Sequence, residues 1–146
     1  MEALKNDIYF SSDFDDMDLE LIYKFIKNSY WGASRTFEEQ KIASENTINF
    51  GFFQNGNQIA YARVMTDKVF FAYLLDVFVV ETHQGKGLSK LLIDKILNFP
   101  ELKNIDKWML ATKDAHKLYE KFDFVAIKSP EKLMEKLSPR AKKIYE

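Results

Sequence analysis

Apolar positions recur at helical spacing in some stretches of the chain and run together in others. Leu19, Ile22 and Ile26 lie three or four residues apart, which predicts an amphipathic helix within residues 16–31. The apolar run over residues 68–80 is rich in Val, Phe and Leu instead, which predicts a long strand. The chain therefore mixes helices with strands, and we see no internal repeat in it.

The other segments extend this pattern into an α+β layout with a mixed sheet, in the order β-α-α-β-β-β-α-β-α-β. The predicted elements are a strand at 7–12, helices at 16–31 and 36–46, a hairpin at 47–67, strands at 68–80 and 107–112, helices at 87–99 and 114–122, and a last strand at 123–128. Thr36 and Glu39 have the spacing of a capping box at the start of the second helix. We expect one domain over residues 1–146, with a core at about 8–127 and a partly helical tail at 128–146.

Composition narrows the class of protein. The chain has 146 residues, of which 47% are hydrophobic and 15% aromatic, so it can form a core. Its net charge of −1 gives no electrostatic reason to expect nucleic acid or an anionic membrane as a partner. Cysteine is absent, which excludes disulfides, thiolate nucleophiles and cysteine-metal sites. The first residues resemble neither a signal peptide nor a membrane span, so we expect a cytoplasmic enzyme or binding module without a metal.

A buried strand leads through two glycines, Gly85 and Gly87, into the next helix. A helix N-terminus presents unpaired backbone N–H groups, and glycine permits a positive φ and the close approach of a ligand. Such a junction binds phosphate, which Lys86 and Lys90 could assist, and a plain connecting turn is the alternative. The spacing fits neither a P-loop, since Leu88 follows Gly87, nor the Rossmann fingerprint, whose last glycine is replaced by Lys90.

Two motifs carry a resemblance to a known family. QGKGLS, residues 84–89, resembles the pyrophosphate loop [QR]-x-x-G-x-[GA] of the GNAT N-acetyltransferases, with Ser89 where Gly or Ala is usual. AHKLYEKFDF, residues 115–124, resembles the family's A-x-x-L-Y-x-K-x-G-F signature, with Asp123 in place of glycine. A strand precedes the loop, a helix follows it, and the order of elements matches, so residues of about 8–127 are identified as a GNAT domain. The chain looks most like small bacterial members with SYWG-x-x-R-T and ARV-x-TD segments.

The resemblance implies the GNAT fold, a mixed and mostly antiparallel central sheet with helices on both faces. It also implies acetyl-CoA as the acetyl donor and direct attack by an acceptor amine in a ternary complex. The loop backbone would hold the pyrophosphate, and the pantetheine arm would lie along a strand that splays from its neighbour. The residues implied to contact acetyl-CoA are Phe78, Val79, Gln84, Gly85, Lys86, Gly87, Leu88, Ser89, Thr112, Asp114, Leu118 and Tyr119.

Two residues are candidates for catalysis. The resemblance implies that Tyr119 protonates the departing thiolate, and a structural tyrosine is the alternative. Asp76 is an acid inside an apolar strand, where a carboxylate is costly unless it is solvated, paired or functional. It could deprotonate the amine, act through a water or bind the ammonium, and an ion pair is the alternative. Strand alternation predicts that Asp76 shares a face with Leu74 and Phe78.

The acceptor site is expected at NSYWGASRT, a polar and aromatic break between the first two helices. Arg35 could bind a carboxylate or phosphate of the acceptor, or it could pair with Glu38 or Glu39. Trp31 could recognise the acceptor or cover the core. The residues predicted to bind the acceptor are Tyr30, Trp31, Arg35 and Asp76. Weaker candidates are Arg63 and Asp67 for the acceptor and Glu81 and His83 for the base, while His116 is expected at the surface.

Other functions stay open from the sequence alone. The expected acceptor is a primary amine of a small molecule. The alternatives are a protein or peptide amine, another acyl donor, a non-catalytic acyl-CoA sensor, or a structural protein that uses this fold. The acidic segment SSDFDDMD fits a protein-lysine acceptor, but it also fits the dipole of the helix that follows. A homodimer formed through the tail is a further hypothesis.

Overall fold

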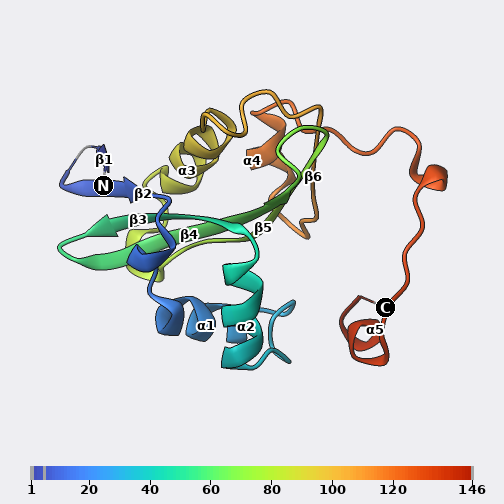
Figure 1. The fold of residues 1–146 in the computed structure, drawn as a ribbon, viewed down its shortest axis with the longest axis horizontal. Helices are drawn as coiled ribbons and strands as arrows, with labels where there is room; N and C mark the ends of the chain where they lie inside the picture. Colours follow the sequence, from blue (N-terminus) through green and yellow to red (C-terminus); the bar gives the residue numbers. More distant parts are fainter. Residues whose placement is uncertain (1, 5, 146) are drawn as a thin grey trace.

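A six-stranded sheet forms the centre of the computed structural model, which describes residues 2–4 and 6–145. The strands lie side by side in chain order (Figure 1). They are β1 (Glu2–Ala3), β2 (Ile8–Ser11), β3 (Ile48–Gln54), β4 (Asn57–Thr66), β5 (Phe71–Val79) and β6 (Lys107–Leu110). Neighbouring strands are antiparallel except β5 and β6, which are parallel. The prediction of a mixed, mostly antiparallel sheet is confirmed.

Helices cover both faces of the sheet, as predicted. In Figure 1, α1 (Leu19–Lys27) and α2 (Phe37–Glu45) lie below it, and α3 (Leu88–Leu97) and α4 (His116–Glu120) lie above it. A fifth helix, α5 (Pro139–Tyr145), ends the described chain, and short 3-10 turns lie at Phe14–Asp16, Glu81–His83 and Pro130–Lys132. Of the helices described, none combines the length and the apolar character that crossing a membrane requires.

Two apolar cores hold these layers together. Phe50 and Phe52 pack with Leu92 on the α3 side of the sheet, and all three are fully buried. Ile22 and Phe78 belong to a smaller core on the α1 side. Each buried side chain of this size contributes about 1.5–3 kcal/mol relative to its exposed state, so the sheet is anchored from both faces.

The start of α2 is fixed by the predicted capping box. The Thr36 hydroxyl accepts from the Glu39 N–H at 3.1 Å, and the Glu39 carboxylate accepts from the Thr36 N–H at 2.9 Å. These reciprocal bonds satisfy two backbone donors that a helix start leaves unpaired. They also set where the preceding loop, which carries the candidate acceptor residues, meets the helix.

A β-bulge interrupts β5 at Asp76. Ala62 of β4 lies opposite both Asp76 and Val77, and Asp76 has a left-handed φ of 52°. The extra residue reverses the alternation of side chains, so Leu74 packs on the α3 side while Phe78 packs on the α1 side. Asp76 points to the α1 and α2 side, where its hydrogen bonds lie. The prediction that it shares a face with Phe78 is confirmed, and the prediction that it shares one with Leu74 is wrong.

The predicted last strand at residues 123–128 is also wrong. The segment pairs with none of the described strands, and Val125 and Ile127 are exposed. A cavity of about 580 Å³ separates it from β6. A short apolar run permits an extended chain, but only a backbone partner makes that chain a strand, and the sequence pattern does not specify the partner.

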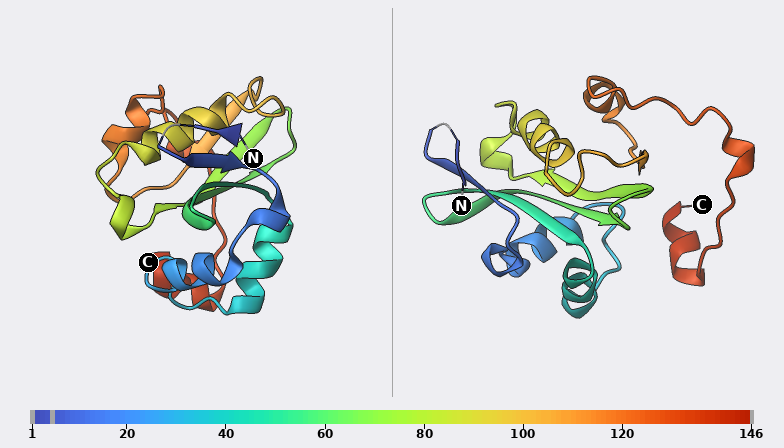
Figure 2. Two further views of the ribbon diagram at one scale, coloured as in Figure 1. Left: turned by 90° about the vertical axis from the view of Figure 1, so that its left-hand side faces the viewer. Right: turned by 45° about the horizontal axis from the view of Figure 1, so that its top comes forward.

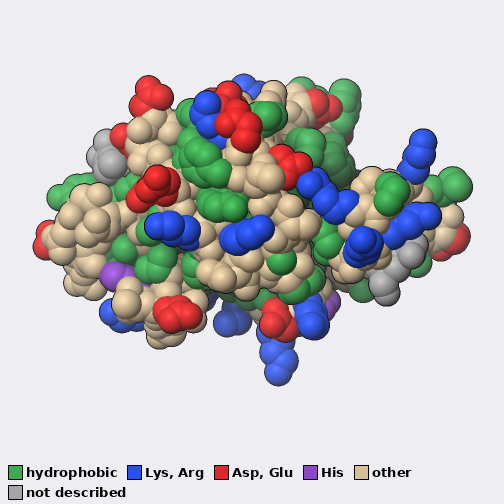
Figure 3. Space-filling view, turned by 90° about the horizontal axis from the view of Figure 1, so that it is seen from below, with side chains coloured by type: hydrophobic (Ala, Val, Ile, Leu, Met, Phe, Trp, Pro, Cys, Tyr) green, Lys and Arg blue, Asp and Glu red, His purple; other side chains and the backbone are tan. Residues whose placement is uncertain are grey.

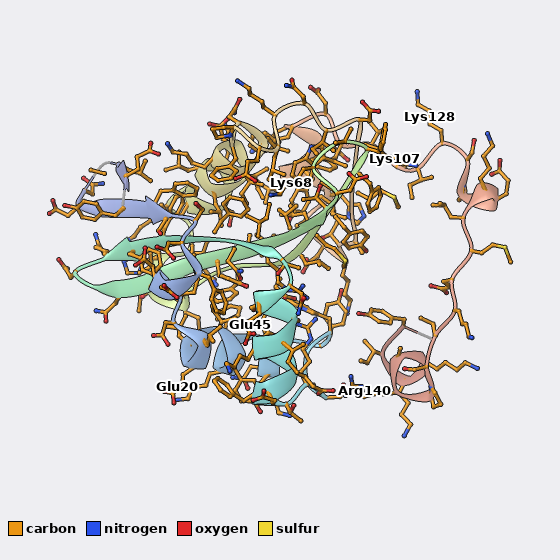
Figure 4. The ribbon with its side chains drawn as sticks, in the orientation of Figure 1. Glu20, Glu45, Lys68, Lys107, Lys128 and Arg140 are labelled. Atoms are coloured by element: carbon orange, nitrogen blue, oxygen red, sulfur yellow. The ribbon has the colours of Figure 1, made fainter. Side chains whose placement is uncertain are left out.

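The C-terminal segment runs away from the body of the protein and returns toward α2 (Figure 2). Seen from below, it forms a separate lobe on which several Lys and Arg side chains gather (Figure 3). Arg140 of α5 projects toward α2 (Figure 4), where its Nη1 pairs with a Glu39 carboxylate oxygen at 2.8 Å. The expectation of a partly helical tail is confirmed, and this ion pair joins the tail to the helix beside the candidate site.

Candidate active site

The glycine junction between β5 and α3 has the backbone conformation that the sequence predicts for an anion site. Gly85 and Gly87 have φ values of 77° and 78°, and Gly87 is the N-cap residue of α3. A Cβ atom added at either glycine would meet nothing within 4 Å. The glycines are therefore required by their φ angles, and the surface above them is open to a ligand.

Side chains around this loop fix it to the sheet. Gln84 Nε2 donates to the carbonyl of Val79 at 2.8 Å, which ties the loop to the end of β5. His83 Nε2 lies 2.7 Å from Gln54 Oε1, and its Nδ1 lies 2.8 Å from the Thr82 hydroxyl. Leu88 is buried in the core on the α3 side, so only its backbone faces the loop. The candidate base His83 is thus engaged in local contacts.

Before the chain reaches this loop, β5 separates from β6. Their ladder ends at the pair Leu74 and Leu110, whereas β5 continues to Val79. The β6-facing backbone edge of β5 after Leu74, which includes Phe78 and Val79, therefore has no strand partner within the described chain. An extended ligand with amide groups can pair with such an edge.

A cavity of about 670 Å³ opens where the strands separate. It brings together residues from three predicted groups: Tyr30, Trp31 and Arg35 from the loop before α2, Asp76 from β5, and Thr112, Asp114 and Tyr119 from the segment after β6. The loop 84–89 and the residues Phe78, Val79 and Leu118 are not part of its wall. Candidate donor-binding and acceptor-binding groups thus meet in one cavity, with the phosphate loop outside it.

Tyr119 lies in this cavity wall with its ring buried. A pair of bonds ends α4 behind it: Asp123 N–H donates to the Glu120 carbonyl and Phe124 N–H to the Tyr119 carbonyl, with Asp123 at a left-handed φ of 68°. The Phe124 ring packs edge-on against the Tyr119 ring. Burial raises the pKa of Tyr119 to about 12, so its hydroxyl stays protonated at neutral pH. Asp123 therefore has the left-handed conformation that glycine adopts most readily.

Asp76 lies in a buried charge cluster. Both of its carboxylate oxygens accept from Arg35 Nη1, at 3.0 and 2.9 Å, and Oδ2 also accepts from Arg63 Nε at 2.7 Å. Gln40 and Trp31 donate to the same carboxylate at 3.2 and 3.1 Å. Its side chain is 1% exposed. The structure thus has the ion-paired arrangement that sequence analysis held as the alternative to a free base.

The electrostatics of this cluster follow from its contacts. Burial alone would raise the pKa of Asp76, but the guanidinium groups of Arg63 and Arg35 and their hydrogen bonds outweigh it, so the pKa is lowered. A carboxylate with a lowered pKa is a weaker base. The pairing of Arg35 with Glu38 or Glu39, held open as the alternative to acceptor binding, is not found among the contacts described. Instead, the Glu39 carboxylate accepts from the Thr36 N–H and from Arg140 Nη1.

Several neighbours of the site carried no sequence signal strong enough to assign them. Gln40 is fully buried in a helix of mostly polar residues and bonds both Arg35 and Asp76. Glu135, Leu137 and Tyr145 from the C-terminal segment line the cavity, although they lie far along the chain from its other walls.

The weaker candidate Asp67 lies outside the cavity wall. It belongs to a turn, where its carboxylate accepts three backbone N–H groups that lower its pKa. Among the described residues, no group of His, Asp and Glu has an arrangement suited to a metal ion.

Comparison with known proteins agrees with this architecture. The family model described as "Acetyltransferase (GNAT) domain" matches residues 11–141. A solved GNAT-family protein of Xanthomonas campestris pv. campestris is 36% identical, with a TM-score of 0.87 over 90% of this chain and 94% of that one. A GCN5-related N-acetyltransferase from Ralstonia eutropha JMP134 is 15% identical, with a TM-score of 0.65 over 90% of this chain and 98% of that one.

Two further proteins are similar to this chain. A protein of Clostridium acetobutylicum solved with acetyl-CoA, and described as a predicted acetyltransferase, is 17% identical with a TM-score of 0.65 over 90% of this chain and 96% of that one. A candidate acetyltransferase of Gibberella zeae is 25% identical over 111 residues, or 73% of this chain, and the chain spans 60% of that protein's length. The fold is that of an acyltransferase. The chain belongs to the GNAT acetyltransferase family.

Proposed function

We propose that the protein is an N-acetyltransferase that moves the acetyl group of acetyl-CoA directly to a primary amine of a small molecule, in the cytoplasm. The observation that carries this proposal is the position of Tyr119. Tyr119 lines the cavity that opens where β5 and β6 separate, and the loop residues Tyr30 and Arg35 line the same cavity. Donor and acceptor could therefore meet in one site, as a ternary complex requires.

The residues present fit acetyl-CoA. Backbone N–H groups of the loop 84–89 would hold the pyrophosphate. The β5 edge at Phe78 and Val79, which has no strand partner although the Val79 carbonyl accepts from Gln84, would pair with the pantetheine amides. When bound, acetyl-CoA supplies the acetyl thioester. Thr112 and Asp114 lie at the cavity wall on the other side, at the end of β6.

Tyr119 acts as the general acid. The amine nitrogen forms a bond to the acetyl carbon, the bond from that carbon to sulfur breaks, and the thiolate takes the Tyr119 proton. Nitrogen gives up two protons to water in the open cavity, one from the acceptor ammonium before the attack and one as the amide forms, because Asp76 is held by two arginines and is a poor base. The tyrosine then recovers its proton from solvent. No covalent acyl-enzyme is needed for this sequence.

The test is a thiol-release assay with a panel of primary amines, run on the wild-type protein and on Tyr119→Phe. General-acid catalysis is typically worth about 10²–10⁴ in rate, so we expect turnover to fall at least about tenfold in the variant. Acetyl-CoA affinity, measured by calorimetry, should change little, because the hydroxyl contributes to the chemical step. Equal turnover by both proteins would exclude Tyr119 from the mechanism. Acetyl-CoA binding without acetylation of any small amine or of lysate proteins would favour a sensor.

A further inference from the structure

The charge cluster beside the cavity is not neutral. Asp76 supplies one negative charge, while Arg35 and Arg63 supply two positive charges, so the cluster carries a net charge of +1. The side chains of Asp76 and Arg63 are 1% and 8% exposed. Burying an unbalanced charge is costly, and the cost falls when an anion binds beside it. The cluster therefore favours an anionic group at its exposed edge.

The exposed edge belongs to Arg35. Its described side-chain hydrogen bonds all use Nη1, which donates to Gln40 at 2.8 Å and to both oxygens of Asp76. Its Nε and Nη2 donors take part in none of them, and the side chain is 20% exposed and lines the cavity. A guanidinium group held at one nitrogen presents its other N–H groups in a fixed fork, which matches the two oxygens of a carboxylate.

The surrounding wall is aromatic and held in place. Tyr30, Trp31, Tyr73 and Tyr145 line the same cavity as Arg35. The indole N–H of Trp31 donates to Asp76 at 3.1 Å, so one carboxylate orients both the ring and the guanidinium. Other charged groups of the wall are Lys113, Asp114 and Glu135. Aromatic faces beside one fixed cation suit a ligand with an apolar or aromatic body and a negative end.

We propose that the acceptor is an amine that carries a carboxylate, of the amino-acid class, whose carboxylate binds the Nε and Nη2 edge of Arg35. Asp76 and Gln40 are positioning residues that hold Arg35 in place. This inference rests on the proposed function, because it names the acceptor for the cavity that also contains Tyr119. It also explains why a strand residue with a left-handed φ is kept at Asp76: the bulge turns the carboxylate toward Arg35.

The test uses matched pairs of amines that differ only in the carboxylate, such as phenylalanine and phenethylamine, with kcat/KM measured for each. A charge-assisted contact of this kind is worth about 1.5–3 kcal/mol, so we expect the wild-type protein to prefer the carboxylate-bearing amine by roughly 10- to 150-fold. In Arg35→Gln this ratio should fall close to one, and in Arg35→Lys it should be intermediate, since the charge stays while the fork is lost. Lys68→Gln is the matched control, because Lys68 pairs with Glu101 at the surface, and its ratio should equal that of the wild type.

Each outcome decides the inference. A wild-type ratio near one, a ratio that Arg35→Gln leaves unchanged, or a preference for phosphate-bearing amines would overturn it. Calorimetry supplies a readout that does not depend on turnover: phenylalanine and N-acetylphenylalanine should bind the CoA-loaded wild-type protein at least tenfold more tightly than Arg35→Gln. Binding with this difference but without acetylation would overturn the proposed function and keep the carboxylate site. Acetylation of carboxylate-free amines alone would do the reverse.

Discussion

The variant Asp76→Asn removes the negative charge of the buried cluster and nearly keeps the size of the side chain. Asparagine tolerates the left-handed φ of 52° found at this position, so the bulge itself should survive the change. The variant leaves Arg35 and Arg63 without their shared anion, and it turns a side-chain amide toward two donors. Removing one partner of a buried ion pair costs about 3–5 kcal/mol, because an uncompensated charge stays behind.

That free energy corresponds to a measurable fall in melting temperature. For a domain of this length, 1 kcal/mol shifts the Tm by about 2–4 °C, so we expect a decrease of roughly 6–20 °C by calorimetry or circular dichroism. Lys68→Gln is again the control. It breaks an exposed pair, which is typically worth less than about 1 kcal/mol. A Tm for Asp76→Asn within about 2 °C of the wild-type value would refute the reasoning, since the cluster would then contribute nothing to folding.

Three further predictions concern pH, the glycine loop and the helix cap. Because the pKa of Asp76 is lowered from 3.8 in the folded protein, its carboxylate stabilises the fold above that value, and the contribution is lost as the pH falls through the lower folded pKa. Urea titrations between about pH 2 and 5 should therefore show a steeper acid loss for the wild type than for Asp76→Asn, and parallel curves would contradict this. Gly87→Ala should lower the free energy of unfolding by about 1–2 kcal/mol and weaken acetyl-CoA binding, since its φ of 78° disfavours a side chain. Equal affinity by calorimetry would remove the loop from the donor site. Thr36→Ala should cost about 1 kcal/mol in urea unfolding, and no loss would mean that the capping box is not formed in solution.

The sequence predicts most of the elements because their apolar periods are local. The helix with Ile22 and Ile26 and the capping box at Thr36 follow from spacings of three and four residues. The bulge at Asp76 does not follow from local spacing, because it depends on how β5 pairs with β4. If strict alternation is assumed along β5, Leu74 is placed on the same face as Asp76, which is wrong. The last strand fails for a related reason: residues 123–128 hold a short apolar run, Phe124 to Ile127, yet a strand also requires a partner edge.

The residues of the candidate site also differ in whether local sequence or long-range contacts determine them. The glycine loop and the short helix with Tyr119 could be predicted because short motifs carry them and their conformation is set by the local backbone, while their roles stay predictions. The cluster around Asp76 joins residues 13 to 45 positions apart, so the sequence could only pose the alternatives of free base and ion pair. Gln40 and Tyr145 could not be predicted, because one resembles an ordinary helix residue and the other reaches the cavity through the path of the C-terminal segment.

The bulge in β5 has a consequence for how the binding of one substrate affects the affinity for the other. Asp76 sits just after the last β5–β6 pair, so its backbone belongs to the edge expected to hold the donor, while its side chain holds Arg35 on the acceptor side. A ligand that pairs with this edge would restrict the Asp76 backbone further and, through its carboxylate, the remaining motion of Arg35, and the effect must be reciprocal. The two substrates should therefore bind with positive cooperativity, with acetyl-CoA raising the affinity for the acceptor as much as the acceptor raises that for acetyl-CoA.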